Sequence, residues 1–233
     1  MARLDRTLKE LQTSIVACQK CPRLTAWRKK ISEEKVRRFA NCDYWGKPLP
    51  GFGDAHAEVL IAGLAPAAHG GNRTGRIFTG DKSGDWLFRA LWKAGFASQA
   101  ESISRRDGMK LTNCFITACC RCSPPQNKLL LEEIRNCRPF LLEEITLLKK
   151  VKVVIGLGKI GFDAIVACYR ELGLLKAERK PKFGHGAVFH LNNSVTLIGS
   201  FHPSQQNTFT KRLTESMFDA VFEKAKSVLL EDK

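Results

Sequence analysis

The chain has 233 residues, 44% of them hydrophobic, and carries 38 Lys and Arg against 23 Asp and Glu, for a formal net charge of +15. This length supports one sizeable core, so we expect a single domain over residues 1–233. No run approaches the roughly eighteen apolar residues of a membrane span, and the N-terminus has no signal-peptide core, so we expect a soluble, cytoplasmic protein with no membrane partner. The charge favours a polyanionic partner, above all nucleic acid, over a merely solvated basic surface.

The first 54 residues are predicted to hold two helices and a loop. Leu4, Leu8, Leu11 and Ile15 recur at helical spacing and predict a helix over residues 3–17. A second helix is expected around Leu24–Ile31. The Gly- and Pro-rich segment 41–54 is expected to be a loop.

The rest of the chain alternates strands with helices. Short apolar runs predict strands at 58–63, 113–119, 152–158 and 194–200. Helices are expected at 84–96, 129–148, 159–172 and 212–230, with a break near Pro139 in the second of these. Residues 185–191 could add an edge strand or a hairpin arm. The alternation predicts an α/β protein, a three-layer α/β/α structure with a central, four-stranded, mostly parallel sheet.

Polar residues, Gly and Pro gather in the segments that follow the strands, namely 63–81, 120–128, 156–161 and 200–212. In an open parallel sheet, ligands bind beyond the carboxyl ends of the strands. Gly156, Gly158 and Gly161 spell GxGxxG, but no second strand ending in an acidic residue follows within the next thirty or so residues, as a dinucleotide site requires. We therefore expect these glycines to let a helix pack close to its strand.

The nine cysteines, without a secretory signal, indicate metal ligands rather than disulfides. Cys18 and Cys21 form a CxxC motif, and Cys122 and Cys137 are separated by fourteen residues. Four thiolates can hold either a zinc ion or a [4Fe-4S] cluster, and spacing does not separate these two. Cys119 and Cys120 also lie beside Cys122, which leaves the third ligand open. The remaining cysteines are expected to be packing residues, namely Cys42, Cys114 and Cys168.

Four motifs together resemble the family 5, or B-type, uracil-DNA glycosylases. They are GLAPAAHGGNRTGRIFTGD at 63–81, RCSPPQNK at 121–128, the HPS tripeptide at 202–204, and the two cysteine pairs. The resemblance runs in order from about Cys18 to beyond Met217. It implies a monofunctional enzyme of base excision repair that flips uracil out of DNA, cuts the bond between base and sugar, and leaves an abasic site.

The resemblance assigns three catalytic residues. Asp81 would orient or activate water or stabilise the sugar cation, although an Asp at a helix start can also be only an N-cap. Asn127 would help to place the water, although an Asn in a turn is also ordinary. His202 would donate a hydrogen bond to the base O2 as negative charge develops there.

Base and DNA contacts follow from the same comparison. Phe78 would stack on the extruded base, unless it is an ordinary core residue. The small-residue floor of the pocket is expected to contain Gly63, Ala65, Pro66 and Ala67. Contacts to DNA are expected from His69, Asn72, Arg73, Ser204, Gln205, Gln206 and Asn207.

Two alanines mark the branch. Ala65 lies where related branches carry a polar catalytic residue, and Ala118 where others carry an Asn that reads uracil. Because Ala65 has no polar group, the resemblance implies that catalysis depends mainly on Asp81 and Asn127. Because Ala118 lacks the selective contact that an Asn makes to uracil, we expect other deaminated bases, such as hypoxanthine and xanthine, to be excised as well.

The resemblance assigns Cys18, Cys21, Cys122 and Cys137 to a structural [4Fe-4S] cluster in an N-terminal cluster-binding segment. The expected partner is DNA containing uracil or other deaminated bases, bound by a monomer in the nucleoid. The alternatives are a non-catalytic Fe-S protein that binds DNA lesions and a redox Fe-S module.

Overall fold

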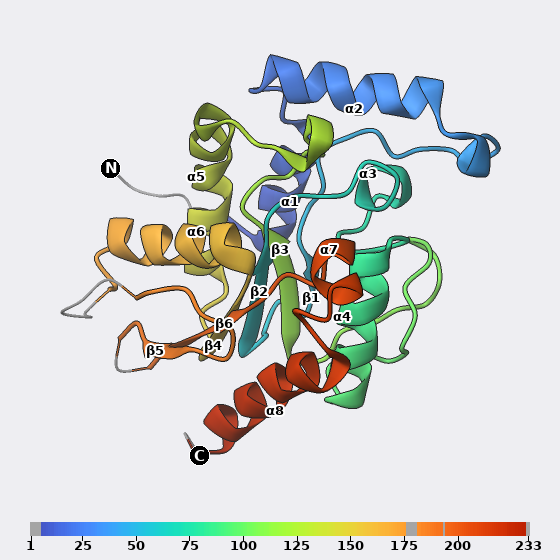
Figure 1. Ribbon diagram of the computed structural model, residues 1–233. Helices are drawn as coiled ribbons and strands as arrows, with labels where there is room; N and C mark the ends of the chain where they lie inside the picture. The colour runs from blue at the N-terminus through green and yellow to red at the C-terminus, as the bar shows by residue number, and fades with distance from the viewer. Residues whose placement is uncertain (1–5, 176–180, 193, 232–233) are drawn as a thin grey trace.

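The computed structural model describes residues 6–175, 181–192 and 194–231 (Figure 1). Its centre is a six-stranded sheet in the order β1-β3-β2-β4-β6-β5. Four parallel strands form the middle and confirm the predicted ones: β2 (Val59–Gly63), β3 (Cys114–Ala118), β4 (Val153–Leu157) and β6 (Thr196–Ser200). Every residue of these strands is buried, as expected of a parallel sheet covered on both faces.

Two short antiparallel strands close the edges and raise the strand number above the predicted four. β1 (Phe52–Gly53) pairs with β3, inside the segment expected to be a loop. β5 (Val188–His190) pairs with β6 and resolves the ambiguous segment 185–191 as an edge strand. The α/β class and the mostly parallel sheet are confirmed.

The helices follow the expected alternation. The long ones are α1 (Leu8–Ala17), α2 (Pro22–Glu34), α4 (Lys82–Lys93), α5 (Leu131–Leu147), α6 (Gly158–Glu171) and α8 (Glu215–Glu231). Short helical turns occur at α3 (Gly71–Thr74), α7 (Gln205–Phe209), η1 (Arg37–Phe39) and η2 (Pro125–Asn127). The expected break near Pro139 is wrong, because α5 continues through this residue. Pro139 and Arg135 are both exposed, so the carbonyl that loses its helical N–H donor can bind water.

Two cores fill the spaces between the layers. Ile61, Ile116 and Ile155 point to one face of the sheet, where they pack with residues of α4 and α8. Leu60, Phe115 and Val154 point to the other face, where they pack with residues of α5 and α6. Figure 1 shows these helix pairs on opposite sides of the sheet, with α1 beside α5. The predicted three layers are confirmed.

The GxGxxG glycines serve packing, as expected. A Cβ on Gly161 would lie 2.6 Å from the backbone oxygen of Ala62, and one on Gly156 would lie 2.7 Å from Cα of Phe162. Helix α6 therefore sits directly against β2 and β4 at the point where the strand order reverses, which is where open α/β sheets bind ligands.

Within residues 6–175, 181–192 and 194–231, we find no helix with the length and apolar character that crossing a bilayer demands.

Candidate active site

A pocket of about 630 Å³ opens at the carboxyl ends of the parallel strands. Three chain segments build it: the loop after β2, the η2 turn after β3, and the start of α7 after β6. Ten of the residues predicted for catalysis, base binding or DNA binding line it: Ala65, Pro66, Ala67, Phe78, Asp81, Asn127, His202, Ser204, Gln205 and Gln206. The sheet thus brings together motifs that lie more than 100 residues apart in sequence.

Phe78 forms one wall and is held in a strained backbone conformation. Its φ of 53° lies in the left-handed region, which costs a bulky residue on the order of 1–3 kcal/mol. Two glycines leave room for this arrangement: a Cβ on Gly84 would lie 1.8 Å from the Phe78 carbonyl oxygen, and one on Gly63 would lie 2.8 Å from the Phe78 ring. Gly63 therefore lies behind Phe78 and supports the pocket wall.

His202 packs against the Phe78 ring, with ring centroids 5.8 Å apart and planes inclined by 31°. Burial lowers the pKa of His202 to about 4. The imidazole is consequently neutral near pH 7 and donates through one ring N–H. The side-chain amide of Asn207 donates to the His202 backbone carbonyl at 2.8 Å and fixes the turn that carries the histidine.

Asp81 is both an N-cap and a pocket residue. Its carboxylate accepts a hydrogen bond from the backbone N–H of Gly84 at 3.0 Å and caps α4. Burial raises the pKa of Asp81, while backbone hydrogen bonds from Gly84 and Ser83 act in the opposite direction. The second carboxylate oxygen, Oδ2, does not cap the helix and lies beside Gly70. A Cβ added to Gly70 would be 2.0 Å from this oxygen. A capped carboxylate with a raised pKa can still accept a proton from a bound molecule.

The η2 turn adds two amide side chains to the lining of the same pocket. Gln126 and Asn127 are exposed and have consecutive positive φ values of 53° and 57°. Such outliers are concentrated at functional sites, where the surrounding structure holds them in place. The sequence predicts Asn127 as a site residue but not Gln126, although both lie within the PPQNK motif at 124–128.

The expected DNA contacts are only partly brought together. Ser204 N-caps α7 by accepting from the Asn207 backbone N–H at 3.4 Å, next to the exposed Gln205 and Gln206. His69 lies outside the pocket, where its Nδ1 is 3.0 Å from the Tyr44 hydroxyl and burial lowers its pKa.

Two expected DNA contacts have structural roles in the same segment. Asn72 is fully buried and its amide donates to the Arg28 backbone carbonyl at 3.4 Å, so the expected DNA contact is wrong for this residue. Arg73 is half-buried and donates to the carbonyls of His69 and Gly80. These positions depend on how the loop folds back, which the local sequence does not specify.

Five cysteines line one small cavity between the ends of α1 and α2, the segment after β3, and α5: Cys18, Cys21, Cys120, Cys122 and Cys137. The Cys137 sulfur accepts from the Arg121 backbone N–H at 3.3 Å, and the Cys21 sulfur from the Asn136 amide at 3.7 Å. Cys119 is engaged elsewhere, with its Sγ 2.9 Å from the Leu64 carbonyl.

The thiols fit a soft metal or an iron–sulfur cluster in their chemistry, and hydrogen bonds to sulfur are typical of such sites. Across the described part of the chain, no three His, Cys, Asp or Glu side chains already form a ready metal-binding group.

Comparison with known proteins identifies the family. The profile described as Uracil DNA glycosylase superfamily matches residues 50–226. A type-5 uracil-DNA glycosylase from Mycobacterium leprae is 44% identical over 223 residues, which cover 95% of this chain and 96% of the relative. One from Thermus thermophilus is 45% identical over 213 residues, covering 91% of this chain and 94% of the relative. The chain belongs to the type-5 uracil-DNA glycosylases. A type-4 uracil-DNA glycosylase from Pyrobaculum aerophilum is 28% identical over 198 residues, covering 84% of this chain and 83% of the relative.

Two positions at or just after the carboxyl ends of β2 and β3 in this type-5 family member carry only a methyl group. Ala65 lines the pocket floor. Ala118 is buried at the end of β3, in register with Gly63 at the end of β2. Neither side chain can donate or accept a hydrogen bond, so these two positions offer no side-chain hydrogen bond to a bound base.

Proposed function

We propose that this protein is a monofunctional DNA glycosylase that flips uracil from DNA into the pocket and hydrolyses the bond between base and sugar. The observation that carries the proposal is the convergence of Phe78, Asp81 and His202 on one pocket in a chain of the type-5 family. An aromatic wall, a buried carboxylate and a neutral imidazole supply the groups that base stacking, water activation and leaving-group stabilisation need.

In the proposed reaction, the flipped base lies against Phe78 with its O2 toward His202. The C1′–N bond breaks with its electron pair on the base, and the His202 N–H stabilises the anion that forms. A water held by Asp81 and Asn127 adds to C1′. The proton that it loses passes to Asp81, whose pKa burial raises toward that of an effective base. The base anion takes up one proton and Asp81 releases the proton it accepted, so the products are the free base, an abasic site and the regenerated carboxylate.

The pocket is proposed to accept hypoxanthine and xanthine as well as uracil. A pocket that hydrogen-bonds one base edge rejects analogues strongly, because its buried polar groups are left unpaired when that edge is missing. Ala118 supplies no such group, and the Phe78 ring can stack on any base.

A [4Fe-4S] cluster is the proposed cofactor, held by Cys18, Cys21, Cys122 and Cys137, with Cys120 as the alternative to Cys122 for the third ligand. When bound, it would link the N-terminal helices to α5 and the segment after β3 and would have a structural role. Protein purified without oxygen should contain iron and sulfide and show visible absorbance. A colourless, iron-free preparation with one bound zinc would favour the zinc alternative.

We also propose that residues 1–233 work as one domain, as a monomer on nucleoid DNA. Support comes from the N-terminal segment, which is joined to the sheet domain by the Arg6–Glu143 ion pair at 3.0 Å. Sedimentation of the purified protein tests the oligomeric state.

The test of function is incubation with duplexes that contain uracil, hypoxanthine or xanthine, followed by alkali. Strand breakage after alkali shows base removal. Breakage at all three lesions supports the full proposal. Breakage at uracil alone overturns the proposal that Ala118 allows the pocket to accept hypoxanthine and xanthine. Lesion-specific binding without breakage would indicate the non-catalytic binder.

A further inference from the structure

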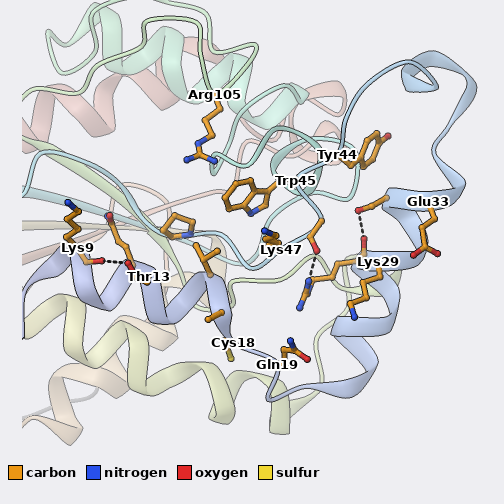
Figure 2. A pocket seen from close by; sticks show the side chains of 17 residues that line it. Lys9, Thr13, Cys18, Gln19, Lys29, Glu33, Tyr44, Trp45, Lys47 and Arg105 are labelled. Carbon is orange, nitrogen blue, oxygen red and sulfur yellow. Dashed lines mark hydrogen bonds between the residues drawn. The ribbon is translucent and has the colours of Figure 1, made fainter.

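A second cleft, of about 880 Å³, lies outside the base pocket (Figure 2). Helices α1 and α2 provide two of its sides, and residues 44–50 together with Arg105 provide the others. Figure 2 shows Trp45 near its centre, with Arg105 above the indole and Lys9 and Lys29 on the flanking helices. The proposed reaction uses none of these residues.

The cleft is strongly cationic. Its lining contains Lys9, Arg28, Lys29, Lys47 and Arg105 but a single carboxylate, that of Glu33. Lys9, Lys29, Lys47 and Arg105 are exposed, and none of them forms an ion pair with another residue that the structure describes. These charges are therefore available to an anionic ligand that spans the cleft.

Trp45 holds two of the cations in place. The Arg105 guanidinium lies 4.5 Å and the Lys47 ammonium 5.6 Å from the indole centroid. The ring itself is fixed, because its Nε1–H donates to the Pro48 carbonyl at 3.2 Å and its other atoms pack on Gly75, where a Cβ would lie 2.9 Å away. Cation–π contacts thus orient Arg105 and Lys47 before any ligand arrives.

The cleft adjoins the base pocket through one short segment. Tyr44 lines the cleft and contacts His69 at 3.0 Å, and Ala67, two residues before His69, lines the base pocket. Backbone hydrogen bonds from Trp45 to Arg73 and from Gly46 to Asn72 hold the cleft against this same segment. A strand that leaves the base pocket past residues 67–69 therefore meets the cations of the cleft.

We propose that this cleft binds single-stranded DNA that flanks the damaged nucleotide, with Lys47 and Arg105 as phosphate contacts. A cleft of this volume accommodates a molecule of drug size, which is the scale of a nucleotide and not of a duplex. Cations interleaved with aromatic side chains are the usual surface for a single strand. The inference rests on the proposed function, because it assumes that the base pocket acts on DNA.

The test measures binding of a uracil-free, single-stranded oligonucleotide by fluorescence anisotropy over a series of salt concentrations. Each lost phosphate contact lowers the slope of log K against log salt by about 0.7 for a single strand, so the double variant Lys47→Gln/Arg105→Gln should lower it by about 1.4. The control Lys149→Gln/Lys150→Gln removes the same charge from exposed positions just before β4, at the opposite end of the sheet, and should leave the slope unchanged.

Three outcomes would overturn the proposal: an unchanged slope in the cleft variant, an equal change in the control, or equal competition by poly-glutamate, which would indicate a non-specific anion surface. Excision of uracil by the wild type is measured in parallel, so that the proposed function and the cleft are tested separately. If the wild type excises no uracil but the cleft variant still lowers the slope, the proposed function is refuted. The proposal that the cleft binds single-stranded DNA is then still supported.

Discussion

Replacing Gly70 with alanine should displace the Asp81 carboxylate while leaving its chemical identity unchanged. The new Cβ would lie 2.0 Å from Oδ2 and 2.7 Å from Cγ of Asp81. Ordinary van der Waals contact begins at 3.4 Å, so the carboxylate must move by about 1.4 Å. The side chain would then rotate away from the Gly84 N–H that it now caps at 3.0 Å.

Two magnitudes follow from this displacement. Loss of an N-cap bond costs about 1 kcal/mol of stability, which leaves an ordinary domain folded. A misplacement of about 1 Å at a reacting group costs on the order of 100-fold in rate. Gly70→Ala should therefore lower the excision rate far more than it lowers the melting temperature.

The assay is single-turnover excision of uracil from a duplex, with melting followed by circular dichroism. Asp81→Asn separates the two effects, because asparagine still caps the helix but carries no charge. Gly184→Ala is the matched control, since its Cβ would meet only the Ala187 methyl, at 3.3 Å. A folded Gly70→Ala protein with a wild-type rate would refute the placement of Asp81 at the reaction centre.

Three further predictions concern the pocket and its support. His202→Ala should reduce single-turnover excision by roughly 10²–10³-fold, the usual loss when one donor to a developing anion is removed; a wild-type rate would exclude this role. Because burial raises the pKa of Asp81 and the proposed active form is the carboxylate, the rate should fall as pH is lowered, with a midpoint above that of an ordinary aspartate. His202, with a pKa of about 4, stays neutral down to that region and should add no second limb between pH 5 and 8, as a pH–rate profile will show. Glu144→Ala should destabilise the fold by about 3–5 kcal/mol in urea unfolding, since it leaves Arg121 charged, buried and unpaired; a loss below about 1 kcal/mol would contradict this.

The parallel strands could be predicted because they are continuous apolar runs that the chain buries on both faces. The edge strand β1 could not, because it has only two residues. For β5, the exposed and weakly apolar pattern does not separate an edge strand from a hairpin arm, so both stay open in the sequence. Pro139 misled the prediction because a proline breaks a helix only when the freed carbonyl has no other partner, and that depends on exposure in the folded protein.

Most of the residues that line the pocket could be placed because they lie in the segments between a strand and the next long helix, and the topology brings the strand ends together. Asn72 could not be distinguished from a surface residue, because its burial arises from packing against Arg28 of a distant helix. The basic cleft also could not be predicted from the sequence. Its cations come from α1, α2 and two loops, and only the tertiary fold gathers them.

The most direct test of the central claim compares the wild type with Asp81→Asn and His202→Ala on one uracil-containing duplex, with alkali cleavage after a single turnover. The account predicts strand breakage by the wild type and losses on the order of 100-fold or more in each variant, with both variants still folded. Full activity in either folded variant would contradict the proposed catalytic site, and no breakage by the wild type would contradict the proposed function itself.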